Sequence, residues 1–562
     1  MKRVFQVAAI AFFCLLTFVT RCHNLRDVFI RRHLYFVDAD CYSRMTRVRM
    51  IAEHQGMVVR HHVFENWPQG VDTHTTAPLD YMILGLGWFA DCGLRIVDWK
   101  GQSVLRGQTL DLAGALISPV IGLAGALFLA VWLWALRLRF WGMALLLYAV
   151  SPIIVHGTLL GRPDHQSLLM LTLMVAIGAE LALAGWAGAQ VPRGSKRLWG
   201  LVSGLAWGFS LWVSLYEPLI LLGTTVALWL AFDRRGFLAR ERWPGWAAFG
   251  VILAVALLID GWRIEAPNPV IREYFPHWER AVGELSHLDL RSPLLYQWLG
   301  WMIVPASALM ILMRKTDRRA VPLLVLLIVL IGLTIWQVRW GYFLGVFYVM
   351  ALPFQLPAWR RPWVARLIFL VALWPVARSW DGDLFPDEPA RERLTVQRAE
   401  QARLRDLALS MTGEGPFLAP WWLSPAIAYW SGDSGVAGSS HESLPGIVDT
   451  ARFFLATTPE QAAAILRKRE VRWVLVDDAD RMIVNSAVVL GIQPPERPLA
   501  RVLAENAGDA PPFLRERVPR RPPIAHFGGS LKFDAEAGPD LEAAPDWLTF
   551  YRIYFVVDAN LP

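Results

Sequence analysis

The chain carries acidic, imidazole and guanidinium groups in the connections between long apolar segments. Hard divalent cations such as Mg²⁺ and Mn²⁺ prefer oxygen ligands, and the carboxylates of Asp40, Asp164 and Glu284 could supply them. Such a cation together with Arg339 would suit a phosphate-bearing, lipid-linked substrate. Charged groups at membrane depth cost about 2.5–3.5 kcal/mol each on insertion scales, so their repetition on one side of a membrane predicts chemistry there.

Each of these residues also has a purely structural interpretation. Asp40 could cap the helix that follows it, and Asp164, which follows Pro163, is typical of a turn and a helix cap. Glu284 could be an ordinary surface carboxylate, and Arg339 could anchor a helix among lipid headgroups. A lone histidine or glutamine in a loop is more often structural or solvated than a ligand.

The composition predicts the elements that must position these groups. Hydrophobic residues make up 55% of the 562 residues and charged residues 18%, which excludes a disordered, collagen-like or coiled-coil chain. The net charge of +7 is typical of basic loops in a membrane protein, so we expect no nucleic-acid partner. Apolar runs long enough to cross about 30 Å of hydrocarbon predict eleven spans, near residues 4–21, 110–136, 140–157, 167–188, 198–214, 217–232, 245–262, 295–313, 320–337, 340–357 and 364–380.

Orientation follows from the lysines and arginines of the short connections. They recur in every second connection, at 137–139, 193–197, 234–242, 314–319 and 360–366, and are almost absent from the others. The positive-inside rule then predicts a cytoplasmic amino terminus in a multi-pass protein of the inner (plasma) membrane. We expect the lipid bilayer itself to be a partner.

Three parts of the chain are then predicted to lie outside the cytoplasm. They are the long connections at about 22–109 and 263–294, and everything after residue 380. Beyond that point strand-like and helix-like segments alternate, which predicts a small α/β domain. The expected fold is therefore a polytopic α-helical membrane protein, with a transmembrane domain over residues 1–380 and an extracytoplasmic α/β domain over 381–562.

These motifs resemble those of the catalytic subunit of oligosaccharyltransferase, in its archaeal and bacterial single-subunit forms within the GT-C superfamily. "DCYSRMTRVRMIAEH" is similar to the family's first acidic motif and places its aspartate at Asp40, and "WPQGVDTHTTAPLDY" places a histidine at His74. "GRPDHQ" resembles the second acidic motif, with Asp164 as its first ligand. "VGEL" and "QVRW" are similar to the motifs that carry a glutamate, at Glu284, and a donor-binding arginine, at Arg339.

The resemblance implies a GT-C fold with thirteen membrane helices, whereas we count eleven spans. It also implies a role for each of the matched residues. The implied roles are Mn²⁺ or Mg²⁺ ligation by Asp40, Asp164, His165, Gln166 and His74, catalysis by Asp40 and Glu284, binding of the donor phosphate by Arg339, and acceptor binding by Glu284, Trp421 and Trp422.

Two positions depart from the family pattern. Leu423 stands where the Trp-Trp-Asp motif has an aspartate that helps accept the hydroxyl of an Asn-x-Ser/Thr acceptor, and leucine accepts no hydrogen bond. Gln166 replaces the acidic residue or histidine usual at the end of the second motif, and His165 could compensate. The donor chemistry therefore carries over better than the acceptor does.

The sequence predicts a metal-dependent membrane glycosyltransferase. It would move a glycan from a polyprenyl-(pyro)phosphate carrier to an extracytoplasmic acceptor, with protein asparagine among the candidates. One alternative is a GT-C enzyme that uses a polyprenyl-monophosphate sugar and glycosylates a lipid or polymer. The others are a transporter for a lipid-linked substrate, which would need charges along a path through the spans, and a scaffold without turnover.

Overall fold

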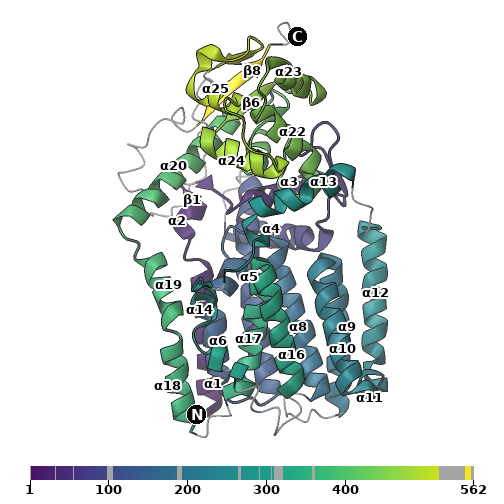
Figure 1. Ribbon diagram of the computed structural model, residues 1–562. Coiled ribbons are helices and arrows are strands. Elements are labelled where there is room, and N and C mark those ends of the chain that lie inside the picture. The colour runs from purple at the N-terminus through teal and green to yellow at the C-terminus, as the bar shows by residue number, and fades with distance from the viewer. Residues whose placement is uncertain are drawn as a thin grey trace.

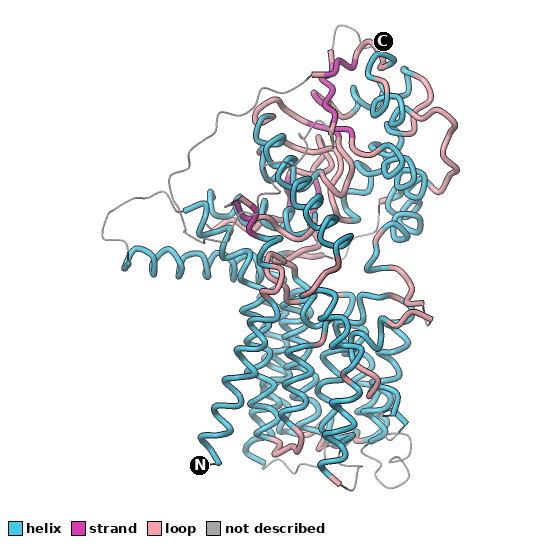
Figure 2. Tube along the Cα trace, turned by 90° about the vertical axis from the view of Figure 1, so that its left-hand side faces the viewer, coloured by secondary structure: helices cyan, strands magenta, loops and turns pink. Residues whose placement is uncertain are grey.

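The computed structural model describes residues 2–31, 33–54, 56–97, 106–185, 193–263, 268–289, 291–305, 307–308, 320–356, 361–517 and 551–557. Helices stand side by side in a bundle, and a C-terminal unit with a small sheet sits over one end of it (Figures 1 and 2). The basic residues expected at 314–319 and at 360 lie outside the described residues, as does most of the chain after residue 517.

The helices of the bundle coincide with the expected apolar segments. Two segments are split: Ser151 is extended before Pro152, which begins a new helix, and Leu373 separates α18 from α19. Residues 306 and 309–313 of the eighth expected span lie outside the described residues. The bundle contains α1 (Lys2–Arg21), α5 (Arg106–Ala135), α6 (Trp141–Val150), α7 (Pro152–Gly157), α8 (His165–Ala184), α9 (Arg193–Val213), α10 (Tyr216–Phe232), α12 (Trp243–Asp260), α14 (Leu294–Leu299), α16 (Ala320–Trp336), α17 (Gly341–Gln355), α18 (Pro362–Ala372) and α19 (Trp374–Leu384).

These helices have the length and composition of membrane-spanning segments. Within the described ranges, four helical stretches are long and apolar enough to cross a membrane: Thr109–Ala135, His165–Ala184, Arg240–Asp260 and Pro362–Leu384. Shorter apolar helices accompany them, among them Tyr216–Phe232. The chain is thus a helical membrane protein, while the count of eleven spans stays a prediction.

The bundle has two unlike ends. The amino terminus, the short helix α11 (Arg234–Phe237) and the start of α18 lie at one end, which we call the arginine-rich face (Figure 1). The C-terminal unit covers the other end, which we call the domain-bearing face (Figure 1). Both long connections lie at the domain-bearing face and contain helices of their own: α2 (Leu25–Val28), α3 (Ala39–Glu53) and α4 (Ala77–Val97) in the first, and α13 (Pro269–Trp278) in the second.

Helix α4 does not cross the bundle, although it is 21 residues long. Its Gly87 packs against Leu110 and Ala113 of α5. Ala115 marks the level of the domain-bearing face, because its carbonyl accepts a hydrogen bond from Gly161 in a connection on that face. Leu110 and Ala113 precede Ala115 in α5 and therefore lie on the side of it away from the bundle. Helix α4 therefore stays on this face, and its Trp88 and Phe89 are 63% and 68% exposed.

The C-terminal unit is built around a mixed sheet of order β5-β6-β8-β7. Strands β5 (Phe417–Leu418) and β6 (Trp473–Val476) are parallel, whereas β8 (Arg552–Val556) is antiparallel to both β6 and β7 (Leu514–Glu516). All four residues of β6 are buried, as expected for a central strand covered on both faces. The unit follows the long helix α20 (Glu388–Ser410), and its helices are α21 (Ser424–Ser431), α22 (Leu444–Phe454), α23 (Pro459–Lys468), α24 (Ala479–Leu490) and α25 (Leu499–Glu505).

Buried arginine bonds fix this unit on the first long connection. Arg469, at the end of α23, donates to Asp449 at 2.7 Å within the unit. The same guanidinium donates to Gln69 at 2.7 Å and to the side chain of Asn66 at 3.0 Å in the first connection. The C-terminal unit and the connections therefore form one structure above the bundle.

Candidate functional site

Helix α3 starts at the acidic cluster. Asp38, and not Asp40, is its N-cap: the Asp38 side chain accepts a hydrogen bond from the backbone N–H of Cys41 at 3.0 Å. Asp40 is the second residue of the helix, so its carboxylate is free of capping and lies beside that of Asp38. The capping interpretation considered for Asp40 therefore belongs to Asp38.

Helix α8 also starts at this cluster. Asp164 precedes its first residue in an extended conformation, but the carboxylate makes no capping bond. One oxygen lies 2.7 Å from Nδ1 of His165, and the other lies 3.5 Å from the guanidinium of Arg162. Because helix N-termini favour negative charge, the starts of α3 and α8 stabilise the carboxylates of Asp38 and Asp164.

Glu284 and Arg339 are brought together by backbone bonds between two 3₁₀ turns. The N–H of Val338, beside Arg339, donates to the carbonyl of Ser286, two residues after Glu284, at 2.9 Å. Glu284 is therefore not an isolated surface carboxylate: it accepts hydrogen bonds from Arg162 at 2.5 Å and from the Tyr342 hydroxyl at 3.0 Å.

Arg162 is the residue that sequence reasoning missed. Its side chain is 3% exposed and lies 2.5 Å from Glu284, 3.5 Å from Asp164 and 3.8 Å from Asp38. The sequence signal was available, because Arg162 is the basic residue in a connection otherwise free of lysine and arginine. It acts as the common countercharge of carboxylates from three separate segments.

Arg339 has a buried partner that the sequence did not indicate. Its guanidinium lies 2.5 Å from Glu217, in the first turn of α10, and Glu217 in turn accepts a hydrogen bond from Ser214 at 2.8 Å. The Nε of Arg339 is buried and donates to no acceptor among the described residues. The side chain as a whole is 19% exposed, so the guanidinium, rather than the buried Nε, is what a ligand can reach.

Two carboxylates of the cluster are held ionised. Burial opposes the ionisation of Asp164, but the neighbouring imidazole and then Arg162 hold its pKa far below the ordinary value. Burial likewise opposes the ionisation of Glu284, and Arg162 is the main group that lowers its pKa.

Asp40 differs from them. Although its side chain is exposed, the protein packed around it, and then the carboxylate of Asp38, raise the pKa of Asp40 to about 8. Asp164 and Glu284 raise it further. Asp40 therefore interacts with both of the carboxylates predicted to share its site.

The residues around Asp164 fit a hard cation. The Oε1 atom of Gln166 is buried and accepts no hydrogen bond from any described residue. Carboxylate and amide oxygens are the ligands that Mg²⁺ or Mn²⁺ prefers, and Asp164, Asp40 and Gln166 offer them here, with the imidazole of His74 also interacting with Asp40.

His74 lies between the acidic cluster and the C-terminal unit, with its ring centroid 6.0 Å from that of His165. Arg44 and Arg47 of α3 both pair with the buried Asp80 of α4, at 2.6 and 2.5 Å, and so fix the segment that precedes α4. His74 lies in this segment, and both its backbone N–H and its Nδ1 pair with the carboxylate of Glu442. Glu442 was not singled out from the sequence.

The predicted acceptor residues lie in the C-terminal unit. Trp421 packs against Trp278 of α13, with ring centroids 6.4 Å apart, and Trp422 donates to Asp477 at 3.4 Å. Leu423 is 8% exposed and packs in the main hydrophobic core. A carboxylate at position 423 would therefore be buried in this fold.

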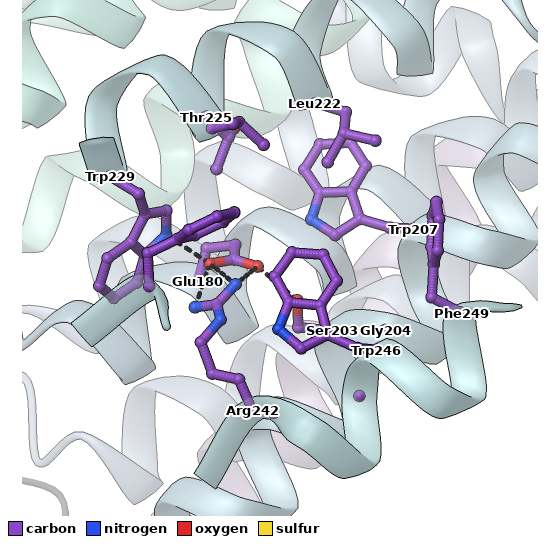
Figure 3. A pocket seen from close by; sticks show the side chains of 14 residues that line it. Glu180, Ser203, Gly204, Trp207, Leu222, Thr225, Trp229, Arg242, Trp246 and Phe249 are labelled. Atoms are coloured by element: carbon purple, nitrogen blue, oxygen red, sulfur yellow. Dashed lines mark hydrogen bonds and ion pairs between the residues drawn. The ribbon is translucent and has the colours of Figure 1, made fainter. Parts of the chain in front are cut away.

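A second buried polar cluster lies near the other end of α8 and lines a pocket (Figure 3), whose wall includes Phe237 of α11 at the arginine-rich face. Glu180 accepts hydrogen bonds from Arg242 at 2.8 Å, from Trp229 at 2.6 Å and from Ser203. Sixteen residues of helix separate Glu180 from Asp164, or about 24 Å. Since Glu180 is neutralised by Arg242 and lies far from the acidic cluster, the two clusters do not form a continuous charged path.

Comparison with known proteins defines the fold. No family model matches the chain, and no curated protein matches it in sequence. Among solved structures, the oligosaccharyltransferase of Archaeoglobus fulgidus tethered to an acceptor peptide with an NVT sequon is similar over 87% of this chain and 72% of its own, with a TM-score of 0.64 and 15% identity. The same enzyme in complex with Zn and sulfate covers 88% and 70%, with a TM-score of 0.63 and 17% identity.

A third similar structure is the archaeal oligosaccharyltransferase AglB of A. fulgidus in complex with an inhibitory peptide and a dolichol-phosphate, with a TM-score of 0.59 and 14% identity over 87% of this chain and 71% of its own. At these identities the likeness defines the fold. The chain has the fold of this archaeal oligosaccharyltransferase, which is the fold that the sequence resemblance implied.

Proposed function

We propose that the protein is a metal-dependent glycosyltransferase that takes a glycan from a polyprenyl-phosphate or diphosphate carrier. The observation that supports this most strongly is the meeting of Asp40, Asp164, Glu284 and Arg339 from four separate segments on the domain-bearing face. The dolichol-phosphate and acceptor peptide bound to proteins of the same fold support a lipid-phosphate donor and a separate acceptor.

Asp40 and Asp164 would hold a divalent cation, with His165 and Gln166 beside them. When bound, the cation supplies charge stabilisation for the leaving phosphate. Arg339 would bind the phosphate through its partly exposed guanidinium, which Glu217 would hold in place.

Glu284 and Asp40 would orient the acceptor. In the transfer, the bond between the sugar carbon and the phosphate oxygen breaks, a bond from that carbon to the acceptor forms, and the acceptor proton passes to a carboxylate. Trp421 and Trp422 would shape the surface that the acceptor approaches. The site would face the extracytoplasmic side, because the arginine-rich face is at the opposite end of the bundle.

A second class of molecule is a candidate for the glycan acceptor. Because Leu423 is buried in the core in place of the family's aspartate, hydroxyl recognition of a sequon by that route is lost. A lipid or polymer acceptor, served by a polyprenyl-monophosphate sugar, is therefore the alternative to a protein asparagine.

The test is a reconstituted reaction with radiolabelled polyprenyl-diphosphate glycan, Mn²⁺ and either an Asn-x-Thr or an Asn-x-Ala peptide. We expect Mn²⁺-dependent release of glycan from the carrier, abolished by EDTA. Asp40→Asn and Asp164→Asn should each lower the rate by at least about 100-fold, whereas Asp72→Asn, an exposed change in the same connection, should not.

Release at equal rates with Mn²⁺ and with EDTA would contradict the metal assignment. Equal labelling of the two peptides would exclude hydroxyl-based recognition. If no peptide is labelled but glycan release depends on Mn²⁺, the non-peptide acceptor is favoured; if no donor is turned over, the enzyme proposal fails.

A further inference from the structure

A pocket lies between α9, α10 and α12 near the arginine-rich face, far from the acidic cluster (Figure 3). Its volume is about 120 Å³, and a cavity of about 150 Å³ holds a benzene ring. Gly200, Gly204 and Gly245 form part of its wall and carry no side chains, so the space between the helices stays open. The rings of Trp246 and Phe249 also line it. A pocket of this size and lining accepts a short length of hydrocarbon chain.

The pocket is reached from the side of the bundle. Helix α12 stands at the outside, because only 11% of its apolar stretch is buried. Trp246 of this helix is 40% exposed although its ring lines the pocket, and the half-buried Leu222 and Val226 of α10 line it as well. The outer surface of a membrane bundle at this depth lies against lipid chains. A lipid chain can therefore enter the pocket directly from the bilayer.

One polar donor in the wall lacks a partner. Trp207 of α9 is 2% exposed, and its Nε1 donates to no acceptor among the described residues. Figure 3 shows this nitrogen turned toward the middle of the pocket. The charged lining residues, Glu180 and Arg242, neutralise each other at 2.8 Å. Because a buried N–H without an acceptor is costly, the pocket suits a chain that carries an uncharged acceptor, such as an ester carbonyl.

Exposed arginines lie beside the pocket at the arginine-rich face. They are Arg234 and Arg235 of α11 and Arg240 of the turn that follows, and none of them forms an ion pair with a described residue. Phe237 of the same short helix lines the pocket. The segment 233–242 carries four arginines and two acidic residues, so it is positively charged. Basic residues next to membrane helices attract anionic lipid headgroups.

The depth of Trp207 below these arginines fits the dimensions of a phospholipid. A Cβ atom built on Gly200 would lie 2.7 Å from the carbonyl oxygen of Glu241, so Gly200 is level with the turn that carries Arg240. Trp207 follows seven residues later in α9, about 10 Å along the helix axis. The headgroup layer of each leaflet is about 5–8 Å thick. A lipid whose phosphate contacts Arg240 therefore brings its ester groups near Trp207.

We propose that this pocket binds an anionic glycerophospholipid of the leaflet at the arginine-rich face. One acyl chain lies in the pocket, an ester carbonyl accepts a hydrogen bond from Nε1 of Trp207, and the phosphate pairs with the exposed arginines. The polyprenyl chain of a glycan donor is the other long hydrocarbon to consider. Under the proposed function its phosphate lies at the opposite face, beside Arg339, and a polyprenyl chain offers no ester to Trp207.

The test is photolabelling of the purified full chain in detergent, with a trace of phosphatidylglycerol that carries a diazirine in one acyl chain. We expect label on the peptides of α10 and α12 that line the pocket. Unlabelled phosphatidylglycerol should compete for this label at least about 10-fold better than phosphatidylcholine, because only the former carries a net negative charge. It should also compete better than a long-chain polyprenyl phosphate.

Three variants separate the parts of the site. Trp207→Phe keeps an aromatic ring but removes the N–H, and should weaken labelling of the pocket by about 3- to 10-fold. The double variant Arg235→Gln, Arg240→Gln should weaken it by at least about 10-fold. Val226→Trp adds an indole to the wall and should abolish the label, because the acyl chain no longer fits.

Trp134→Phe and Arg139→Gln are the matched controls. Both residues are exposed, Trp134 at the end of α5 and Arg139 in the connection that follows it, and neither lines the pocket. These two variants should be labelled like the wild type.

Several results would overturn the inference. They are equal competition by phosphatidylcholine, label spread evenly over the lipid-facing helices, and unchanged labelling in both Trp207→Phe and the double arginine variant. Stronger competition by the polyprenyl phosphate would assign the pocket to the donor chain instead. Because no glycan transfer is measured, failure of the proposed enzyme activity would leave the labelling result intact.

Discussion

At the scale of single residues, Arg162 decides how the acidic cluster behaves without a cation. It is buried against Glu284, Asp164 and Asp38, and these carboxylates have few other countercharges among the described residues. Removing Arg162 would leave the buried Asp164 with fewer countercharges, while water would partly compensate Asp38 and Glu284, which are 39% and 36% exposed. Arg162 therefore neutralises part of the negative charge that a bound cation would otherwise neutralise.

We therefore expect Arg162→Gln to make the fold depend on metal. In EDTA the variant should melt well below the wild type, and Mn²⁺ should restore more of the loss than it adds to the wild type. Melting temperatures in detergent, with and without Mn²⁺, measure this. Arg280→Gln, an exposed arginine of the second connection, is the control, and equal melting of Arg162→Gln and wild type in EDTA would contradict the idea.

The raised pKa of Asp40 predicts that cation binding strengthens as the pH rises. A carboxyl group whose pKa is raised to about 8 in the folded chain stabilises that fold fully below its unfolded pKa, which is about 4. That contribution is lost as the pH rises through 8. A cation must displace the proton, so its binding strengthens over the same interval.

The predicted observation is a Mn²⁺-induced increase in melting temperature that grows between about pH 5 and pH 8. It should be measured beside an EDTA series at each pH. The growth should be smaller in Asp40→Asn, which has no proton to displace at this position. A shift that is constant or falls with pH would show that Asp40 does not bind the cation.

At the scale of elements, three glycines let α9 and α12 touch along their backbones. Gly200, Gly204 and Gly208 recur every four residues of α9, the spacing of close-packed membrane helices. A Cβ atom built on Gly204 would lie 1.9 Å from the carbonyl oxygen of Gly245 in α12. The contact therefore tolerates no side chain at this position.

Gly204→Ala should destabilise the protein because the helices must separate, although alanine is favoured over glycine in a helix by up to about 1 kcal/mol. Gly223→Ala on α10 is the matched control, since a Cβ atom there meets nothing within 4 Å. We expect a lower melting temperature for Gly204→Ala and an unchanged or higher one for Gly223→Ala. Equal effects would mean that α9 and α12 are not packed this closely.

The helices also show which parts of the fold could be predicted from the sequence and which could not. The membrane spans could be predicted because each is a long apolar run. The segments that carry the site could be predicted because acidic residues occur at the ends of those runs. The break at Pro152 was missed because hydropathy does not register a change in backbone direction. Helix α4 was not predicted as a separate element because it lies inside the first long connection, which the sequence analysis treated as one external segment.

The pairings of the site could not be predicted from local patterns. Arg162 and Glu284 are 122 residues apart, and Glu217 and Arg339 meet because the start of α10 packs against the end of α16 and the turn that follows it. The sequence indicates that such charges need partners, but only the fold determines which partners they have. The same holds for Leu423, whose burial in the core no motif could reveal.

At the scale of the whole molecule, the C-terminal unit is attached to the bundle through the first connection. Arg469 joins the two by bonding Asp449 on one side and Gln69 and Asn66 on the other. We expect Arg469→Met to loosen the unit, because it leaves buried acceptors unpaired. The helices of the bundle should be unaffected.

Limited proteolysis with mass spectrometry tests this. Arg469→Met should be cleaved faster within the C-terminal unit than the wild type, while Arg497→Met, an exposed change in the same unit, should not. Unchanged cleavage of Arg469→Met would mean that other contacts suffice to hold the unit in place.

Helix α4 has a consequence for how the molecule shapes its surroundings. Because α4 lies on one face with Trp88 and Phe89 exposed, we expect it to lie at one membrane interface and to add cross-section to that leaflet alone. A protein that is wider in one leaflet than in the other is accommodated best where lipid packing is asymmetric. Its lateral distribution should therefore respond to membrane curvature as well as to hydrophobic thickness.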